Sequence, residues 1–139
     1  MIKEVKELLL RYLSMTVPYR VKILHEGWDF DRDCECSSVE TLIGINDRFV
    51  YTLWKDEKNK HSICEPLSVL DYKPFLRPMS SMTEEEEKKY SLLCFEVSYY
   101  DKDTPKCSFE LIKWLLEKHF DFMGLIAKGL ALEAPKEMY

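Results

Sequence analysis

The stretch DFDRDCECSSVE, residues 29–40, has the residue types and spacing that come closest to a metal site in this sequence. Five of its twelve steps match a calcium loop, in which carboxylate and hydroxyl oxygens surround the cation. Step six, where such a loop needs Gly for its sharp turn, is occupied by Cys34. The flanks also have the pattern of strands rather than helices, so we favour a polar connection over a calcium site. The five matching residues are Asp29, Asp31, Asp33, Ser37 and Glu40.

A second interpretation of this stretch is one half of a zinc site. Cys34 and Cys36 offer two thiolates, while His61 and Cys64 offer an imidazole and a third thiolate. Thiolate and imidazole are the ligands that zinc prefers in proteins. A hairpin that turns at residues 46–47 would bring the two pairs together at its open end. Zinc is therefore the one metal that these residues could hold. The alternative, which we favour, is that the protein binds no cofactor and that the four residues are unrelated, with Cys64 simply buried.

Motifs for covalent or cofactor chemistry do not occur in the sequence. It has no P-loop, no glycine-rich dinucleotide fingerprint and no nucleophile elbow. His25 is expected on a strand with mixed exposure. His119 is expected near the C-terminus of a helix, where a positive charge suits the helix dipole. Nothing pairs either histidine with a second acid–base group, so we predict no catalytic residue and favour a protein that is not an enzyme.

The aromatic residues offer a contact surface as well as a core. Trp54 and Trp114 lie in apolar segments and are predicted to be core residues. Trp28 lies between Gly27 and Asp29, where we expect it to be exposed. Exposed Trp is enriched in protein interfaces. Trp28 is therefore the predicted contact point for a protein partner.

A helix and a group of strands are predicted for the first half of the chain. Residues 3–14 have apolar residues at the i, i+3, i+4, i+7 spacing of an amphipathic helix. Alternation and β-branched residues then indicate strands, two of them joined by a two-residue loop at Asn46-Asp47 that makes Ile45 face Arg48. Two strands alone would be marginal, so at least a third is expected. The predicted strands are residues 19–26, 39–45, 48–54, and either 62–65 or 68–72.

Helices are predicted for the second half. The segment 73–83 contains two prolines and is not expected to form a central strand. Thr83 and Glu86 have the spacing of a capping box, so a helix should start there. Its end is ambiguous, because LCFEVSYY also fits a strand. A third helix is expected over 109–119, and a short fourth one between Asp121 and Gly129.

Composition fits one soluble domain. The chain has 139 residues, of which 46% are hydrophobic, and a net charge of −5 that disfavours non-specific binding to nucleic acid. No secretion signal or membrane-spanning run is visible, and the five cysteines are an odd number, so we expect reduced thiols in the cytoplasm. The predicted fold is a single α+β domain over residues 1–139: a helix (1–14), a small antiparallel sheet (19–72) with barrel-like closure as one alternative, and two or three helices (83–139).

Three segments carry a resemblance to a known group. LLLRYLSMTVPYRVKI, KPFLRPMSSMTEEEEKKY and WLLEKHFDFMGLIAKGLALEAPKEMY resemble small uncharacterised proteins of gut Bacteroides-type bacteria and their phages or mobile elements. The resemblance implies a bacterial, prophage or mobile-element context and carries over no catalytic residue. The sequence departs from the group at Arg20, where Gly is frequent.

These observations together favour an accessory protein that works by binding another protein and has no catalytic activity. Two alternatives remain open. One is a zinc-binding protein that uses the four residues named above, and the other is a phage protein associated with nucleic acid, which the net charge disfavours.

Overall fold

The computed structural model describes residues 2–29, 34–46, 49–55, 60–66, 72–100 and 106–139. For residues 2, 27–29, 34–36, 54–55, 60–66 and 100 it describes the backbone alone. The elements are α1 (Ile2–Thr16), the 3₁₀ turn η1 (Val17–Tyr19), β1 (Lys22–Asp29), β2 (Cys34–Ile45), β3 (Phe49–Lys55), β4 (Lys60–Pro66), β5 (Tyr72–Leu76), the 3₁₀ turn η3 (Met79–Ser81), α2 (Glu84–Tyr100), α3 (Lys106–Glu117) and β6 (Leu132–Glu133).

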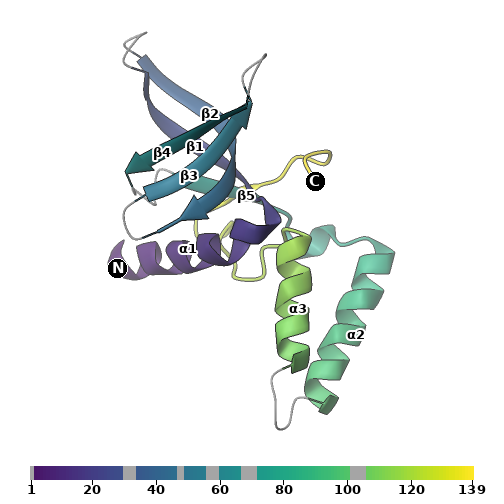
Figure 1. Ribbon diagram of the computed structural model, residues 1–139. Coiled ribbons are helices and arrows are strands. Elements are labelled where there is room, and N and C mark those ends of the chain that lie inside the picture. The colour runs from purple at the N-terminus through teal and green to yellow at the C-terminus, as the bar shows by residue number, and fades with distance from the viewer. Residues whose placement is uncertain (1, 30–33, 47–48, 56–59, 67–71, 101–105) are drawn as a thin grey trace.

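The strands form one open, mixed sheet in the order β4-β3-β2-β1-β5-β6. Every neighbouring pair is antiparallel except β5 and β6, which are parallel. One helix precedes the sheet strands β1–β5 and two helices follow them (Figure 1). The predicted α+β class is therefore confirmed, and the sheet does not close into a barrel.

The core lies between α1, the sheet and the segment that follows α3. Leu9, Tyr12 and Leu13 of α1 are at most 1% exposed, which confirms the apolar face predicted for this helix. They pack with the buried side chains of the strands and of the last segment of the chain. The other members of this core are Val21, Ile23, Leu42, Val50, Tyr72, Leu76, Leu116, Leu125, Leu130 and Ala131.

The first strand begins later than predicted because the chain turns twice before it. Pro18 lies in the turn η1, and Arg20 then takes the left-handed conformation, with φ 56° and ψ 48°. The Arg20 N–H donates a hydrogen bond to the Val17 carbonyl, which closes the turn. Left-handed geometry is costly for residues with a Cβ and free of that cost for Gly. The predicted strand at 19–26 is therefore wrong at its start, and β1 begins at Lys22.

The hairpin of β2 and β3 has a different register from the predicted one. Ile45 pairs with Val50, not with Arg48, and the register shifts between Leu42 and Gly44. The side-chain oxygen of Asn46 accepts a hydrogen bond from the Phe49 N–H at 2.7 Å, and this contact fixes the turn. β2 also begins at Cys34, so residues 34–40 of the acidic stretch are strand rather than a connection.

β5 contains Pro74 and is an inner strand of the sheet, which makes the prediction for residues 73–83 wrong at its start. Proline is tolerated there because each neighbour pairs with only part of the strand. Pairing with β1 ends at Pro74, opposite Ile23, and pairing with β6 begins one residue later at Phe75. No ladder therefore has to continue across the missing N–H.

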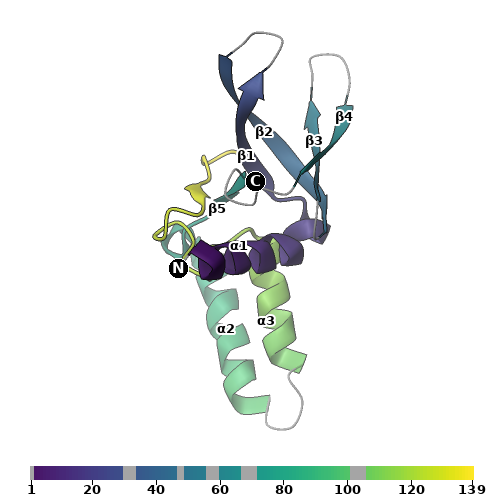
Figure 2. The ribbon, with the colours of Figure 1, turned by 90° about the vertical axis from the view of Figure 1, so that its left-hand side faces the viewer.

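α2 begins with the predicted capping box. The Glu86 N–H donates to Thr83 Oγ1 at 3.2 Å, and the Thr83 N–H donates to Glu86 Oε1 at 3.1 Å. The helix continues to Tyr100, so LCFEVSYY is helical. α3 lies beside it, and the two form a helical hairpin that projects away from the sheet (Figure 2).

α3 ends in a Schellman motif, which displaces His119 from its predicted helical position. The His119 N–H donates to the Leu116 carbonyl, and the Phe120 N–H donates to the Leu115 carbonyl. These are the two hydrogen bonds of the motif. The residue just before the last one of the motif is left-handed, and it is usually Gly. His119 occupies that position with φ 60°.

The predicted fourth helix does not form, and residues 121–130 make successive turns instead. The residues that were predicted to start and end this helix, Asp121 and Gly129, nevertheless have the expected local roles. Asp121 accepts hydrogen bonds from the N–H groups of Leu125 and Ile126 at 2.7 and 3.0 Å. Gly129 is left-handed, with φ 72°. Gly124, in the middle of the segment, is also left-handed, with φ 70°, and this interrupts a right-handed helix between the two signals.

Candidate functional site

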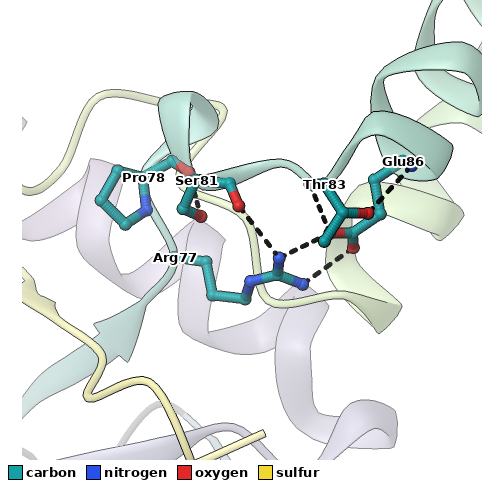
Figure 3. A network of polar contacts seen from close by, with 5 residues as sticks. All are labelled: Arg77, Pro78, Ser81, Thr83 and Glu86. Atoms are coloured by element: carbon teal, nitrogen blue, oxygen red, sulfur yellow. Dashed lines mark hydrogen bonds and ion pairs between the residues drawn. The ribbon is translucent and has the colours of Figure 1, made fainter.

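The corner between β5 and α2 is built around an ion pair. Arg77 follows the last residue of β5, and Glu86 lies in the first turn of α2. Arg77 Nη1 and Nη2 donate to the two Glu86 carboxylate oxygens at 2.9 and 2.7 Å (Figure 3). This two-point geometry is the strongest form of an arginine–carboxylate pair. The hydrogen bond from Arg77 is the main reason why the pKa of Glu86 falls to about 2, with partial burial opposing it.

Arg77 also holds the segment after α3. Its guanidinium lies 4.3 Å from the centre of the Phe120 ring, at the distance of a cation–π contact. Its backbone N–H donates to the His119 carbonyl, and its carbonyl accepts from the Asp121 N–H, both at 2.8 Å. One residue therefore joins β5, the start of α2 and the chain beyond α3.

A cavity of about 480 Å³ opens beside this corner. Its walls come from η3, the start of α2 and the last residues of the chain, including Pro78, Pro135 and Tyr139. The volume is in the range of small-molecule sites. Its charged groups are two acids and two bases, and the pairing of Arg77 with Glu86 already uses one of each. The lining therefore selects no ligand by net charge.

His119 and Tyr139 stack behind the cavity, with their ring centres 3.7 Å apart. The Tyr139 hydroxyl accepts from the Lys22 N–H and donates to the Phe75 carbonyl, each at 2.8 Å, so it ties β1 to β5. His119 is buried, and its Nδ1 has no hydrogen-bond partner among the described residues. Burial, with the positive charges of Arg77 and Lys22, lowers the pKa of His119 to about 4.

A second polar cluster lies on the inner face of the sheet, around Glu40 of β2. Glu40 is only 2% exposed, and its carboxylate accepts hydrogen bonds from Ser38, Thr52 and His25 Nδ1, the last at 3.1 Å. The His25 ring stacks on Tyr72 with centres 4.5 Å apart. Burial favours the neutral carboxyl, but the hydrogen bonds, chiefly that from His25, outweigh burial and lower the pKa of Glu40.

The carboxylates of Glu40 and Glu86 therefore already accept several hydrogen bonds within the protein. Glu40 was also the last step of the calcium interpretation, but both of its oxygens accept hydrogen bonds from side chains of the sheet. A carboxylate with its oxygens so engaged is held as a structural acceptor. The cluster around Glu40 thus holds neighbouring strands together, and the Arg77–Glu86 corner holds β5 to the start of α2.

The four predicted zinc ligands lie on two strands. Cys34 and Cys36 of β2 pair with Asp29 and Gly27 of β1. His61 and Cys64 are on β4, and β3 lies between β4 and β2 in the sheet. Their side chains lie outside the described residues, so the zinc site stays a prediction that the metal content of purified protein can decide. Within the described part, no group of three His, Cys, Asp or Glu residues could hold a metal ion.

Trp28, the predicted partner contact, is on β1 and pairs with Glu35 of β2. Its side chain is likewise outside the described residues. Trp114 is half-buried between α2 and the body of the molecule. Its ring stacks on Tyr90, with centres 6.5 Å apart, and tilts against Phe120 at 5.7 Å.

The described surface is most apolar on the two outer sides of the helical hairpin. Leu92, Phe95 and Tyr99 of α2 are 50%, 57% and 61% exposed, and we call them the α2 flank. Phe109 and Ile112 of α3 are 66% and 40% exposed, and we call them the α3 flank. Ile112 is expected from the sequence to face inward, and its exposure shows that this expectation is wrong. The three- and four-residue spacing of Leu92, Phe95 and Tyr99 in a predicted helix was a usable signal for the α2 flank.

Comparisons with protein-family models, with curated proteins and with solved structures find no match to this chain. A search of the described helices for one that is long and apolar enough to cross a membrane also finds none.

Proposed function

We propose that this protein is a non-catalytic accessory protein that binds other proteins through the flanks of its α2–α3 hairpin. The observation that carries the proposal is the pair of apolar stripes on the outer sides of this hairpin. The bacterial, prophage or mobile-element context implied by the sequence resemblance is compatible with such a role. Zinc binding by the residues on β2 and β4 remains the alternative.

The first support is that α2 has two apolar faces. Successive residues of a helix are rotated by about 100°. The stripe Tyr90, Leu93 and Val97 points toward α3, and Leu93 is only 5% exposed. The α2 flank is centred about 160° away from this stripe, on the opposite face. A helix that served only as one half of a hairpin would need the first stripe alone.

The second support is the size and chemistry of the exposed groups. Large apolar side chains that gather on one surface mark interaction sites more often than single exposed residues do. Phe and Tyr, which form most of these flanks, are also enriched at the centres of protein interfaces. The acids at the centre of the two polar clusters, Glu40 and Glu86, already accept structural hydrogen bonds. Binding by the flanks is therefore favoured over acid–base chemistry at either cluster.

The experiment is photo-cross-linking with a benzophenone amino acid placed singly at Tyr99 and at Phe109. The matched controls are the exposed polar positions Ser98 and Glu110, one residue away on the same helices. We expect discrete protein adducts from at least one flank position and none from its neighbour. Equal labelling at flank and control positions, or no adduct at any, would contradict the proposal.

A further inference from the structure

We infer that the α2 flank belongs to a homodimer interface, in which α2 of a second copy packs antiparallel across it. This inference rests on the proposed function, because it names the partner for one of the two flanks. The two-fold axis passes close to Leu92, the middle of α2, so the two Leu92 side chains meet, while Phe95 and Tyr99 of each copy cover the first half of the other copy's α2. Such an isologous contact requires that the surface be complementary to itself.

The apolar part of the flank is preorganised for this contact. Leu92, Phe95 and Tyr99 follow the i, i+3, i+7 spacing and lie within an arc of about 60° on the helix. The rings of Phe95 and Tyr99 stack with their centres 5.6 Å apart and their planes 19° from parallel. They form a continuous ridge along the exposed side of α2, so little side-chain freedom is lost when it is covered.

The charges beside the ridge are self-complementary. Lys89 and Glu96 lie on the same side of the stripe, seven residues or about two turns apart. Neither takes part in an ion pair within the described part of the chain. In an antiparallel pair, residues on the same side of both helices face each other across the axis. Lys89 of each copy then faces Glu96 of the other, which gives two symmetric ion pairs.

Lys88 continues the exposed stripe one turn before Leu92. The antiparallel copy places it across from the Phe95 ring, where its stem and charge can both pack. A parallel copy would bring together residues at the same level of the two helices, so Lys89 and Glu96 of different copies would stay about two turns apart and could not pair. The antiparallel arrangement also aligns the two helix dipoles favourably.

The α3 flank does not have this pattern. Lys113, which lies beside Ile112, is already paired with Glu117 of the same helix at 3.8 Å. The flank has two large apolar residues, Phe109 and Ile112, rather than a ridge of three. The α3 flank therefore serves as the internal control for the α2 flank.

The predicted dimer is weak. α2 has 17 residues, so it is about 25 Å long. One helix face of that length buries less than the roughly 800 Å² per partner of a standard interface, which is the size class of weak and transient contacts, so we expect association at micromolar concentrations and above.

The experiment is analytical ultracentrifugation of the full chain from about 1 µM to about 500 µM. We expect a reversible shift from the mass of one chain to that of two. Glu96→Lys and Lys89→Glu each place like charges across the axis and should weaken dimerisation about tenfold, and the double variant should restore it. Leu92→Asp should abolish it, while Phe109→Asp should leave it unchanged. Far-ultraviolet circular dichroism checks that every variant folds.

The dimer inference is overturned if the chain stays monomeric throughout, if the double charge swap fails to restore association, or if Phe109→Asp removes it. A monomer whose position 99 is cross-linked to a different protein rejects the dimer and keeps the proposed function. A monomer without specific cross-links rejects both. A dimer with specific cross-links between two copies at position 99 supports both.

Discussion

At the scale of single residues, two non-glycine residues in the described part of the chain take the left-handed conformation. Arg20 and His119 have φ angles of 56° and 60°, and each closes a helical turn. His119 has a ring stack with Tyr139 to offset the cost of that geometry. Arg20 ends η1, and its side chain is exposed. The cost at Arg20 should therefore be recoverable by substitution.

The first prediction is that Arg20→Gly stabilises the protein by up to about 1 kcal/mol, because Gly adopts positive φ without a Cβ clash. The gain is partly offset by the greater chain entropy of unfolded Gly. Chemical denaturation measures the change in the free energy of unfolding. Arg20→Ala is the matched control, since it removes the same side chain and keeps the Cβ. Equal stability of the Gly and Ala variants would contradict the explanation.

The second prediction concerns pH and the Arg77–Glu86 pair. The pKa of Glu86 is about 2 in the folded protein and about 4.5 when unperturbed. The ion pair therefore contributes fully above pH 4.5, and its contribution is lost as the pH falls from 4.5 to 2. Glu86→Gln should lower the free energy of unfolding by about 2 kcal/mol at pH 7, after allowance for partial exposure, and by little near pH 2.

Gln suits this test because it can replace Glu in the capping box while it removes the charge. The control is Glu87→Gln, one residue along on the exposed side of α2, which should change stability little at either pH. Urea denaturation at pH 7 and at several values below 4.5 measures both variants. A pH-independent difference between wild type and Glu86→Gln would show that the pair has another role.

At the scale of elements, a few side-chain hydrogen bonds fix where elements begin and how they join the sheet. Thr83 and Glu86 start α2, and Arg77 then joins this first turn to the end of β5. Asp121 performs the same task for the turns that follow α3. The sheet is fastened across three strands by the hydrogen bonds to Glu40. The α2–α3 hairpin is joined to the body only at its base, and this leaves its flanks exposed (Figure 1).

The third prediction belongs to this scale. Asp121 is 9% exposed, and its carboxylate satisfies the N–H groups of buried Leu125 and half-buried Ile126. Asp121→Ala leaves both donors without a partner and should cost about 2–3 kcal/mol in the free energy of unfolding. Asp121→Asn keeps one acceptor oxygen and should cost clearly less. Thermal denaturation of the three proteins provides the measurement, and equal losses for Ala and Asn would count against this role.

At the scale of the whole molecule, the charge distribution bears on the class of partner. The net charge is −5, and the start of α2 presents Glu84, Glu85 and Glu87 as exposed acids. A phosphate backbone attracts a basic surface and is repelled by an acidic one. The apolar flanks, rather than any basic face, are therefore the surface on which binding depends in our proposal.

The fourth prediction follows from this charge. The protein should pass unretained through a column of immobilised double-stranded DNA at about 50 mM salt, where non-specific binding is strong. A basic protein of similar size serves as the positive control for the column. Retention that weakens steeply as salt rises would instead support the nucleic-acid alternative, because each phosphate contact releases counterions.

Local signals in the sequence determined much of this fold. Each of these signals depends on residues within one or two turns: the apolar period of α1, the capping box at Thr83, and the turn residues Asp121 and Gly129. The α+β class also follows, because it needs only the type and order of the elements. The predicted hairpin register is wrong because the turn held by the Asn46 side chain pairs Ile45 with Val50, and the irregularity between Leu42 and Gly44 then shifts the register again by one residue. Neither feature changes the apolar pattern of the sequence.

Only the tertiary structure decided which residues far apart in the chain meet. Glu40 receives donors from three strands, Tyr139 joins β1 to β5, and Arg77 contacts both α2 and Phe120. The acceptance of Pro74 in an inner strand likewise depends on where its neighbours stop pairing. The physical reason is that a helix period or a cap is encoded within a few residues. A long-range contact, and the exposure of one apolar stripe when its neighbour is covered, depends on how all the elements pack.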